Sequence, residues 1–392
     1  MSQSLERRGR FLLRSFALTG LTILLVNCGS ANSDAGPSDL PDGAPERVVP
    51  EPIVELGVTR GDSTQQFHDI RTPFVFNSGQ VVVPDGGSNT IRVFSPDGEL
   101  VRTVGGSGEG PGEFAALGTV WHRGDTIEAW DIRQRRLTRF FPDDSVQVIS
   151  FESVSGVQQI VPGTLPDGWI SIGVSDAAMG ERDEMVVRHF GLDGNHRGLI
   201  ARTKGMARHR TSRAAGPGPL SPRPQFDVAN GQVFVAETLT PEIRVLSPSG
   251  DSVRTVSWRP DHRPSPDEAA RQTIETIIAS QSSEDTAEER KLLRSFPVPE
   301  RVSAFWSFLV DAEGFIWVQP YDPQRHSMQL GGARTAGPGG EWIVFSSAGE
   351  RLTTIRMPAG LRPTEISSDA VVGISRSEVG VESVQIYPLE RR

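Results

Sequence analysis

The sequence IRVFSPDGELVRTV occupies residues 91–104 and returns twice, in altered form, further along the chain. The copies read IRVLSPSGDSVRTV at residues 243–256 and WIVFSSAGERLTTI at residues 342–355. In each of them, apolar residues alternate on both sides of a short turn. The turn contains a glycine, such as Gly98, which adopts the positive φ of a tight hairpin loop without strain. Each stretch therefore predicts two antiparallel strands joined by a tight turn.

An earlier strand precedes each hairpin and makes the hairpin part of a larger repeating unit. Weaker hairpin copies span residues 137–151 and 186–202, and a last strand is predicted at Val384–Tyr387. The earlier strands are predicted at Gln80–Val83, Thr126–Trp130, Trp169–Val174, Gln232–Ala236, Phe315–Val318 and Val371–Ser375. A further short apolar stretch, such as Phe74–Phe76, comes before each of them. Six units of four strands, recurring roughly every 40 to 50 residues, have the spacing of propeller blades.

The two ends of this repeat favour closure into a ring. The last unit lacks its fourth strand, and Ile53–Leu56 is a spare strand that precedes the first unit. Pairing the two would complete the sixth blade and remove two exposed sheet edges. The rival folds are a seven-bladed propeller and an array of β-sandwiches, but a seventh blade would have to lie in residues 259–300, which have a helical pattern. We therefore expect an all-β fold over residues 51–392: a six-bladed β-propeller with four antiparallel strands per blade, closed by an N-terminal strand.

The stretch GGSGEGPGEF at residues 105–114 follows the first hairpin and resembles the NHL-type repeat. In that family a Gly-rich segment ending in Gly-Glu-Phe links one blade to the next. Over residues 52–390 the arrangement resembles the six-bladed propeller lipoproteins of bacteria. The resemblance implies the fold, and it is nearly silent on function.

The N-terminus carries an export signal. A basic start containing Arg7 and Arg8 is followed by the apolar run Phe16–Val26 and then by Cys28. The segment resembles the lipobox of bacterial lipoproteins, which implies a signal peptide at residues 1–27 and lipidation of Cys28; the Arg pair leaves a twin-arginine signal as an alternative. Residues 28–50 are small, polar and rich in Pro, so we expect a disordered tether. The protein would then lie at the cell envelope, on the periplasmic or extracellular side, held to the membrane by its lipid.

Two connections between blades are extended, at residues 202–225 and 259–300. The second contains a helical pattern over Asp267–Phe296, which places a helical insertion between blades 4 and 5. Connections from one blade to the next share one face of a propeller, so both insertions should decorate one rim and lie side by side. A partner or ligand platform is the functional interpretation, and a helix that closes the channel mouth is the alternative. The candidate rim residues are Arg202, Lys204, Arg208, Arg210, Arg213, Ile274 and Ile278.

Composition narrows the classes of partner. The net charge of −9 excludes a chain-wide basic footprint for nucleic acid, and the single cysteine excludes a disulfide framework. We expect a monomer that needs no cofactor and binds an unidentified protein or small ligand on the insertion-bearing face. The seven tryptophans fall mostly within predicted strands, where packing between blades is favoured over stacking on sugars.

Catalysis stays open as an alternative. Six-bladed propellers include lactonase-like hydrolases and lyases that hold a divalent metal, such as calcium, at the channel mouth. The residues that could supply ligands here are His68, Asp69, His122, Asp131, Asp227 and Glu237. They match no recognisable ligand set, and the histidines show no metal-ligand spacing. A binding scaffold is therefore the favoured function, and a metal-dependent hydrolase or lyase in the central channel is the alternative.

Overall fold

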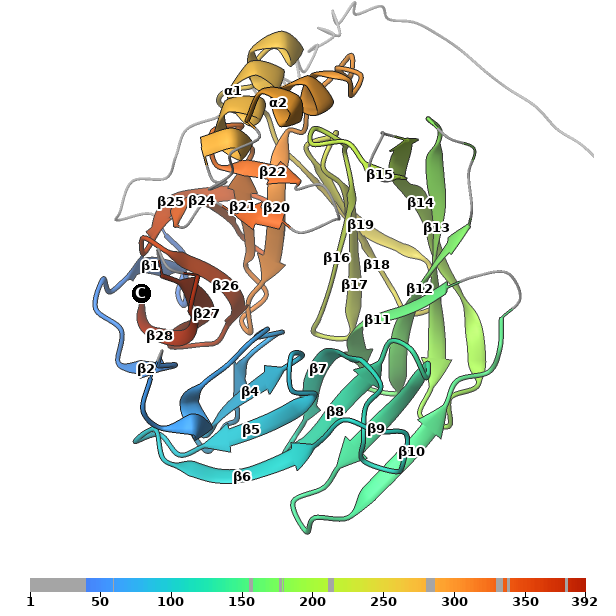
Figure 1. The fold of residues 1–392 in the computed structure, drawn as a ribbon, viewed down its shortest axis with the longest axis vertical. Helices are drawn as coiled ribbons and strands as arrows, with labels where there is room; N and C mark the ends of the chain where they lie inside the picture. The colour runs from blue at the N-terminus through green and yellow to red at the C-terminus, as the bar shows by residue number, and fades with distance from the viewer. Residues whose placement is uncertain are drawn as a thin grey trace, which may run out of the picture. The chain divides into compact units, whose positions relative to one another are not determined.

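Antiparallel sheets follow one another around a central axis (Figure 1). The computed structural model describes residues 40–392, apart from residues 59, 155–157, 176–177, 179, 211–214, 280–285, 329–333, 337–338 and 378–379. In this part of the chain there are six sheets of four or five strands and one two-stranded sheet. The predicted signal peptide 1–27 and the lipidation site Cys28 lie outside the described residues.

We number the blades from the one that contains both N-terminal strands. Blade 1 consists of β26 (Leu361–Ile366), β27 (Ala370–Arg376) and β28 (Glu382–Arg391), with β1 (Pro45–Val48) and β2 (Val54–Leu56) both paired to β28. A short 3₁₀ helix at Ser63–Gln65 leads to blade 2, which contains β3 (Phe74–Val75), β4 (Val81–Asp85), β5 (Thr90–Phe94) and β6 (Leu100–Gly105). Blade 3 contains β7 (Leu117–Arg123), β8 (Thr126–Asp131), β9 (Arg136–Phe140) and β10 (Val146–Ser150).

The other three blades carry the additional elements. Blade 4 contains β11 (Gln158–Leu165), β12 (Gly168–Ser175), β13 (Arg182–Gly191), β14 (His196–Arg210) and β15 (Ala215–Pro217). Blade 5 contains β16 (Pro224–Ala229), β17 (Gln232–Glu237), β18 (Glu242–Leu246) and β19 (Ser252–Ser257). Blade 6 contains β20 (Phe305–Val310), β21 (Ile316–Pro320), β24 (Gly340–Phe345) and β25 (Arg351–Met357), with the small hairpin β22 (His326–Met328) and β23 (Arg334–Ala336) inserted between its second and third strands. The predicted six-bladed fold is thus confirmed.

The N-terminal strands close the ring as expected, and they do so twice. In β2, Val54 pairs with Ile386 of β28, which confirms the spare strand predicted at residues 53–56. In β1, Val48 pairs with Leu389 further along the same strand. The prediction of a disordered tether is therefore wrong for residues 45–48. Composition alone missed this strand, because its stability comes from the free edge of the long strand β28 and from burial of Val48, which is 8% exposed.

The helical insertion lies between β19 and β20 and consists of two helices, α1 (Pro266–Ala279) and α2 (Thr286–Arg294). This is the junction of blades 5 and 6, and the expected junction of blades 4 and 5 is corrected accordingly. The expectation counted from the first complete unit and assigned the N-terminal strands to the last blade. Ser265 caps α1, because its hydroxyl accepts a hydrogen bond from Glu268 N at 3.3 Å, and Pro266 occupies the first helical position.

Two further features went unrecognised in the sequence. Most of the predicted 202–225 connection is strand: β14 runs on to Arg210 and turns back into β15. The β22–β23 hairpin also lacks a clear apolar alternation. Both form at the edge of the ring, where pairing with a partner strand stabilises them more than the β propensity of their own residues does.

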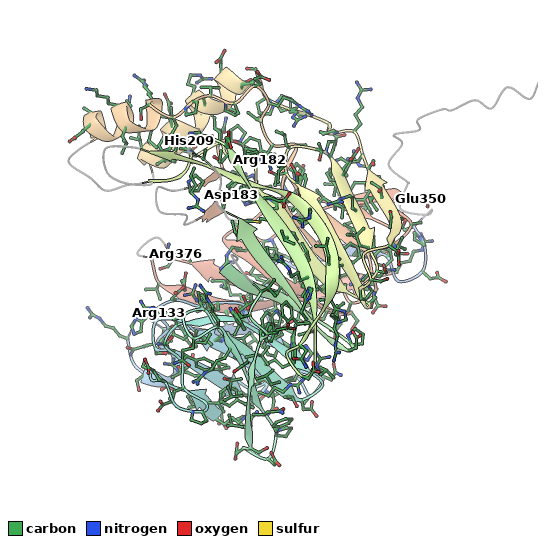
Figure 2. All side chains as sticks on the ribbon, turned by 90° about the vertical axis from the view of Figure 1, so that its right-hand side faces the viewer. Arg133, Arg182, Asp183, His209, Glu350 and Arg376 are labelled. Carbon is green, nitrogen blue, oxygen red and sulfur yellow. The ribbon has the colours of Figure 1, made fainter. Side chains whose placement is uncertain are left out.

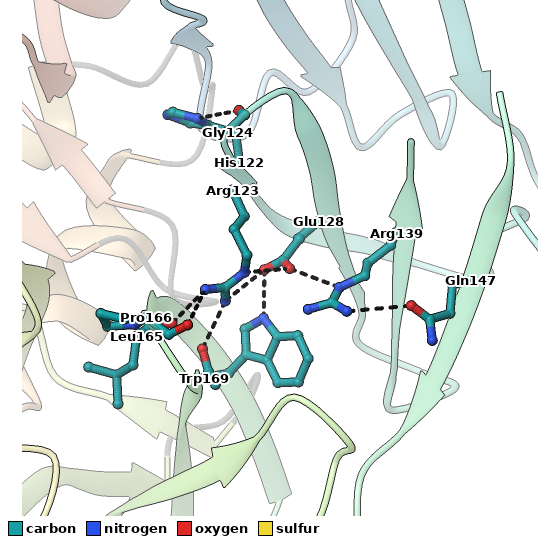
Figure 3. A network of polar contacts seen from close by, with 10 residues as sticks. His122, Arg123, Gly124, Glu128, Arg139, Gln147, Leu165, Pro166 and Trp169 are labelled. Atoms are coloured by element: carbon teal, nitrogen blue, oxygen red, sulfur yellow. Dashed lines mark hydrogen bonds and ion pairs between the residues drawn. The ribbon is translucent and has the colours of Figure 1, made fainter. Parts of the chain in front are cut away.

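Tryptophans and one ion-pair network join neighbouring blades. Trp130, Trp169 and Trp317 are at most 1% exposed, and the expected packing role of the tryptophans is confirmed for them. Figure 3 shows Glu128 of β8 at the centre of the network. Its carboxylate accepts hydrogen bonds from Arg123 Nε and Arg139 Nε, both at 3.0 Å, and from Trp169 Nε1 of blade 4 at 2.7 Å. Arg123 continues to the carbonyls of Leu165, Pro166 and Gly168, so that this network clamps blade 3 to blade 4.

Candidate functional site

A pocket of about 420 Å³ lies where the two predicted insertions meet. One wall comes from the end of β14 and the segment after β15, and the other comes from α1 and the chain that follows α2. The lining residues are Arg182, Ala207, His209, Gly218, Pro219, Leu220, Ser221, Pro222, Ala270, Thr273, Ile274, Leu293, Arg294, Phe296, Pro297, Val298 and Pro299. The two insertions are therefore neighbours, as the propeller connections predicted.

The wall on the blade 4 side approaches the helices closely at Gly218, which has no side chain. A Cβ atom on Gly218 would lie 3.0 Å from Phe296 Cδ1 and 3.5 Å from His209 Cδ2. The His209 ring meets the Phe296 ring edge to face, with centroids 6.0 Å apart. Pro219 and Pro222 restrict the backbone that follows. This wall is consequently stiff and tightly packed at one end.

The helical wall presents apolar side chains at helical spacing. Ala270, Thr273 and Ile274 line the pocket from α1, and Leu293 lines it from α2. Thr273 is fully buried, and its hydroxyl lies 3.4 Å from the Pro323 carbonyl oxygen, so it also fixes the helix to blade 6. Beyond α2, the Ser295 hydroxyl donates to Leu292 O at 2.6 Å, which ends the helix just before Phe296.

Most of the polar capacity of Arg182 is already occupied. Its guanidinium donates to Glu237 Oε2 at 2.9 Å, to Gly205 O at 2.7 Å and to Lys204 O at 3.0 Å. By contrast, the side chains of His209 and Arg294 have no hydrogen-bond or ion-pair partner within the part of the chain that the structure describes. Figure 2 shows Arg182, Asp183 and His209 at the end of blade 4 that faces the helices. The pocket thus combines an apolar interior with His209 and Arg294 as groups able to bind a ligand.

The predicted basic rim is partly neutralised. Arg202 forms an ion pair with Glu184, and Arg208 pairs with Asp183 at 3.4 Å, both carboxylates being on the adjacent strand β13. Lys204 is exposed, and Arg210 lies at the end of β14, opposite Ala215 of β15. Arg202, Lys204 and Arg208 do not line the pocket. Arg213 is outside the described residues.

Only one of the two predicted apolar rim residues lines the pocket. Ile274 lines the pocket, whereas Ile278 is half-buried on the last turn of α1 and does not line it. The sequence pattern did not single out Leu220, Phe296 or Arg294. A signal for them exists in the Pro- and Gly-rich run 216–222 and in the apolar residues between the prolines that end the helical pattern.

The candidate metal ligands occupy separate positions in the blades. Asp131, at the end of β8, accepts hydrogen bonds from the backbone N–H groups of Ala115, Arg133 and Gln134. His122 stacks on Phe74 with centroids 4.9 Å apart. Asp69 pairs with Arg71, Glu237 pairs with Arg182, and His68 is exposed. Among the described residues no group of three His, Cys, Asp or Glu side chains is placed to hold a metal ion.

Burial raises the pKa of two carboxylates on innermost strands. Burial raises the pKa of Asp227 to about 6, although the carboxylate accepts hydrogen bonds from Val228 N and from Val310 N of the next blade, both at 2.8 Å. Burial likewise raises the pKa of Glu365 to about 7, with one hydrogen bond, at 3.2 Å, from Val75 N of blade 2. Each carboxylate joins the inner strands of adjacent blades, which is a structural role.

These sheets and their closure define the protein as a six-bladed β-propeller with insertions on one rim. No protein-family model and no curated protein matches the chain. Similar solved structures include a protein from Bacteroides fragilis named as an exported protein, with 13% identity, a TM-score of 0.45 and coverage of 85% of this chain and 94% of that one. A member of the DUF4221 family from Bacteroides vulgatus has 9% identity, a TM-score of 0.49 and coverage of 88% and 99%.

Virginiamycin B lyase from Staphylococcus aureus is also similar, with 10% identity, a TM-score of 0.39 and coverage of 85% of this chain and 98% of the lyase. At these TM-scores the likenesses carry no argument about function, and the fold rests on the strand pairing itself. In the described residues no helix is both long and apolar enough to cross a membrane.

Proposed function

We propose that this propeller is a binding scaffold, and that the pocket between its two insertions holds a ligand with an apolar body. The observation that carries the proposal is the pocket itself: about 420 Å³, lined mostly by apolar side chains from two segments that are far apart in the sequence. Ligand sites of proteins are concave, mostly apolar and roughly 300 to 1,000 Å³ in volume, with a few polar groups that orient the ligand.

The construction of the walls supports a preformed site. Four prolines and Phe296 line the pocket, and Gly218 allows its two walls to approach closely. Stiff walls lose little conformational entropy when a ligand binds, so more of the burial energy of the ligand appears as affinity.

The cellular address is part of the same proposal. A signal peptide at residues 1–27 and a lipid on Cys28 would place the ring at the cell envelope, facing the periplasm or the exterior. Phe114, the last residue of the NHL-type stretch, is fully buried against blades 2 and 3, which supports a resemblance to NHL-type propellers. Mass spectrometry of the mature N-terminus tests the address: an acylated Cys28 supports it, and an unmodified chain that begins at another residue contradicts it.

The pocket is tested with N-phenyl-1-naphthylamine, a neutral apolar dye that fluoresces when it leaves water. We expect the full chain to bind the dye and Ile274→Trp to weaken the binding at least tenfold, because the indole fills the pocket. Glu275→Trp is the matched control, since Glu275 is exposed on the same helix and does not line the pocket. Equal dye binding by the wild type and both variants, all with wild-type thermal unfolding, would contradict the proposal.

A further inference from the structure

The charges at the pocket differ in sign from those of the chain as a whole. The sequence contains 49 acidic and 40 basic residues, for a net charge of −9. Among the described residues, those that line the pocket nevertheless include Arg182, His209 and Arg294 and no Asp or Glu. The described lining of the pocket therefore carries basic groups on a protein that is acidic as a whole. This contrast favours a ligand with negative charge over one with positive charge.

These basic groups are not equivalent. Arg182 is held in an ion pair with Glu237, whose other carboxylate oxygen accepts from Thr203 Oγ1 and Lys204 N, both at 3.1 Å. Adding an anion there would compete with Glu237. Arg294 is exposed at the end of α2 and has no ion-pair partner within the described residues. Among the described residues that line the pocket, Arg294 is accordingly the cation that remains available to a ligand.

His209 and Arg294 both line the pocket and are linked through Phe296. Phe296 contacts the His209 ring, and Arg294 precedes Phe296 by two residues at the end of α2. The α1 part of the helical wall contributes Ala270 and Ile274. A ligand can therefore place an apolar body against α1 while a polar end reaches His209 and Arg294.

We propose that the ligand is an amphipathic organic anion, with an apolar body in the pocket and one acidic group, such as a carboxylate, at Arg294 and His209. This inference rests on the proposed function and adds the ligand class to it. The volume of about 420 Å³ corresponds to about 14 water molecules at roughly 30 Å³ each, so a body of about 14 non-hydrogen atoms fills it. A medium-chain fatty acid has both the size and the charge.

Two dyes that share one body separate the two proposals. 8-Anilinonaphthalene-1-sulfonate has the anilinonaphthalene body of N-phenyl-1-naphthylamine plus one sulfonate. In the full chain, we expect the sulfonate dye to bind at least fivefold more tightly than the neutral dye. Arg294→Gln should remove most of that difference and leave the affinity for the neutral dye within twofold. Raising the salt concentration should reduce the difference as well, because Arg294 is exposed.

The matched control is Lys291→Gln, which removes a positive charge from the last turn of the same helix at a residue that does not line the pocket. Decanoate should then displace the sulfonate dye at lower concentration than 1-decanol does. If both dyes bind, both are blocked by Ile274→Trp, and their affinities are equal or respond alike to Arg294→Gln and Lys291→Gln, the anion inference is wrong and the proposed function stands. If neither dye responds to Ile274→Trp, the proposed function fails first.

Discussion

Replacing Glu128 by Gln should destabilise the junction between blades 3 and 4 more than any comparable surface change. The Glu128 side chain is fully buried and accepts hydrogen bonds from Arg123, Arg139 and Trp169 (Figure 3). Gln keeps the shape of the side chain but replaces one acceptor oxygen by an NH₂ donor. In either orientation of the amide, that donor faces an N–H group of Arg139 or of Trp169, and the two guanidinium groups lose their counter-charge.

The size of the effect follows from the contacts. A hydrogen bond to a charged group contributes about 1.5 to 3 kcal/mol, and removing one partner of a buried ion pair costs about 3 to 5 kcal/mol. The side chains of Arg123 and Arg139 are 28% and 13% exposed, so water recovers part of the loss. We therefore expect a loss of about 3 to 4 kcal/mol in the free energy of unfolding. With an unfolding entropy of about 2.1 cal/mol/K per residue, a domain of this size loses about 4 to 6 °C in Tm.

Differential scanning calorimetry of the wild type and Glu128→Gln measures this shift. Glu341→Gln is the control, because Glu341 pairs with Arg356 on the surface, where the two side chains are 59% and 79% exposed, and such pairs contribute about 0 to 1 kcal/mol. A double-mutant cycle with Arg139→Gln should return a coupling of at least about 1 kcal/mol. If Glu128→Gln lowers Tm no more than Glu341→Gln does, the network does not clamp the blades and the reasoning is refuted.

Three other outcomes are expected. Glu365→Gln should flatten the pH dependence of Tm, because the pKa of Glu365 is raised to about 7 and the folded state therefore binds more protons than the unfolded state between about pH 4.5 and 7. The stability of the wild type falls as pH rises through that window, by at most about 3 kcal/mol. The variant should be the more stable of the two at pH 8 and not at pH 4.5. Val48→Ala should cost about 2 kcal/mol through lost burial in blade 1, whereas Arg47→Ala, at an exposed position of the same strand, should cost less than about 1 kcal/mol; equal and negligible effects would mean that β1 does not close the ring. Treatment of the purified protein with a chelator should leave dye binding unchanged, while elemental mass spectrometry follows the metal content of the same samples. About one tightly held calcium per chain, whose removal abolishes a hydrolytic or lyase activity, would favour catalysis in the channel instead.

The blades could be predicted from the sequence because the information that specifies them is local. A hairpin needs alternating side chains and a turn, and Gly98 and Gly250 have the expected positive φ values of 84° and 90°. Gly250 has a second reason to be glycine that no local pattern reveals, since a Cβ there would lie 2.8 Å from Ile200 O of the neighbouring blade. Local patterns thus identify the turn, while the contact between blades is set by residues distant in the sequence.

The short edge strands could not be predicted, because their stability lies in their partners. β1 and β15 each pair with the end of a long strand, β28 or β14, that extends beyond the rest of its blade. Neither segment has enough alternating apolar residues to be recognised alone.

The ion pairs that neutralise part of the rim depend on the register of β13 against β14, and the pattern of basic residues did not reveal them. The pairing of β13 with β14 places Val186 opposite Arg202 and Glu184 opposite Lys204, after two register shifts between the turn and these pairs. Glu184 is then a diagonal neighbour of Arg202, and an ion pair between them follows from cross-strand geometry. The basic residues of β14 are consequently less available to an anion than their number implies.

The scaffold itself explains why the proposed binding site lies on the insertions. Asp85 and Asp131 end the second strands of blades 2 and 3, and each carboxylate accepts hydrogen bonds from three backbone N–H groups, with the Ser88 hydroxyl as a fourth donor to Asp85. Glu237 is held instead by side chains, because it accepts from the Arg182 guanidinium and the Thr203 hydroxyl. Because these blade carboxylates already fix the ring, a ligand that engaged them would have to disrupt contacts that hold the blades. The pocket residues Ile274 and Arg294 take no part in these blade contacts. Substitutions in the two insertions can therefore change the proposed ligand while the blades stay intact.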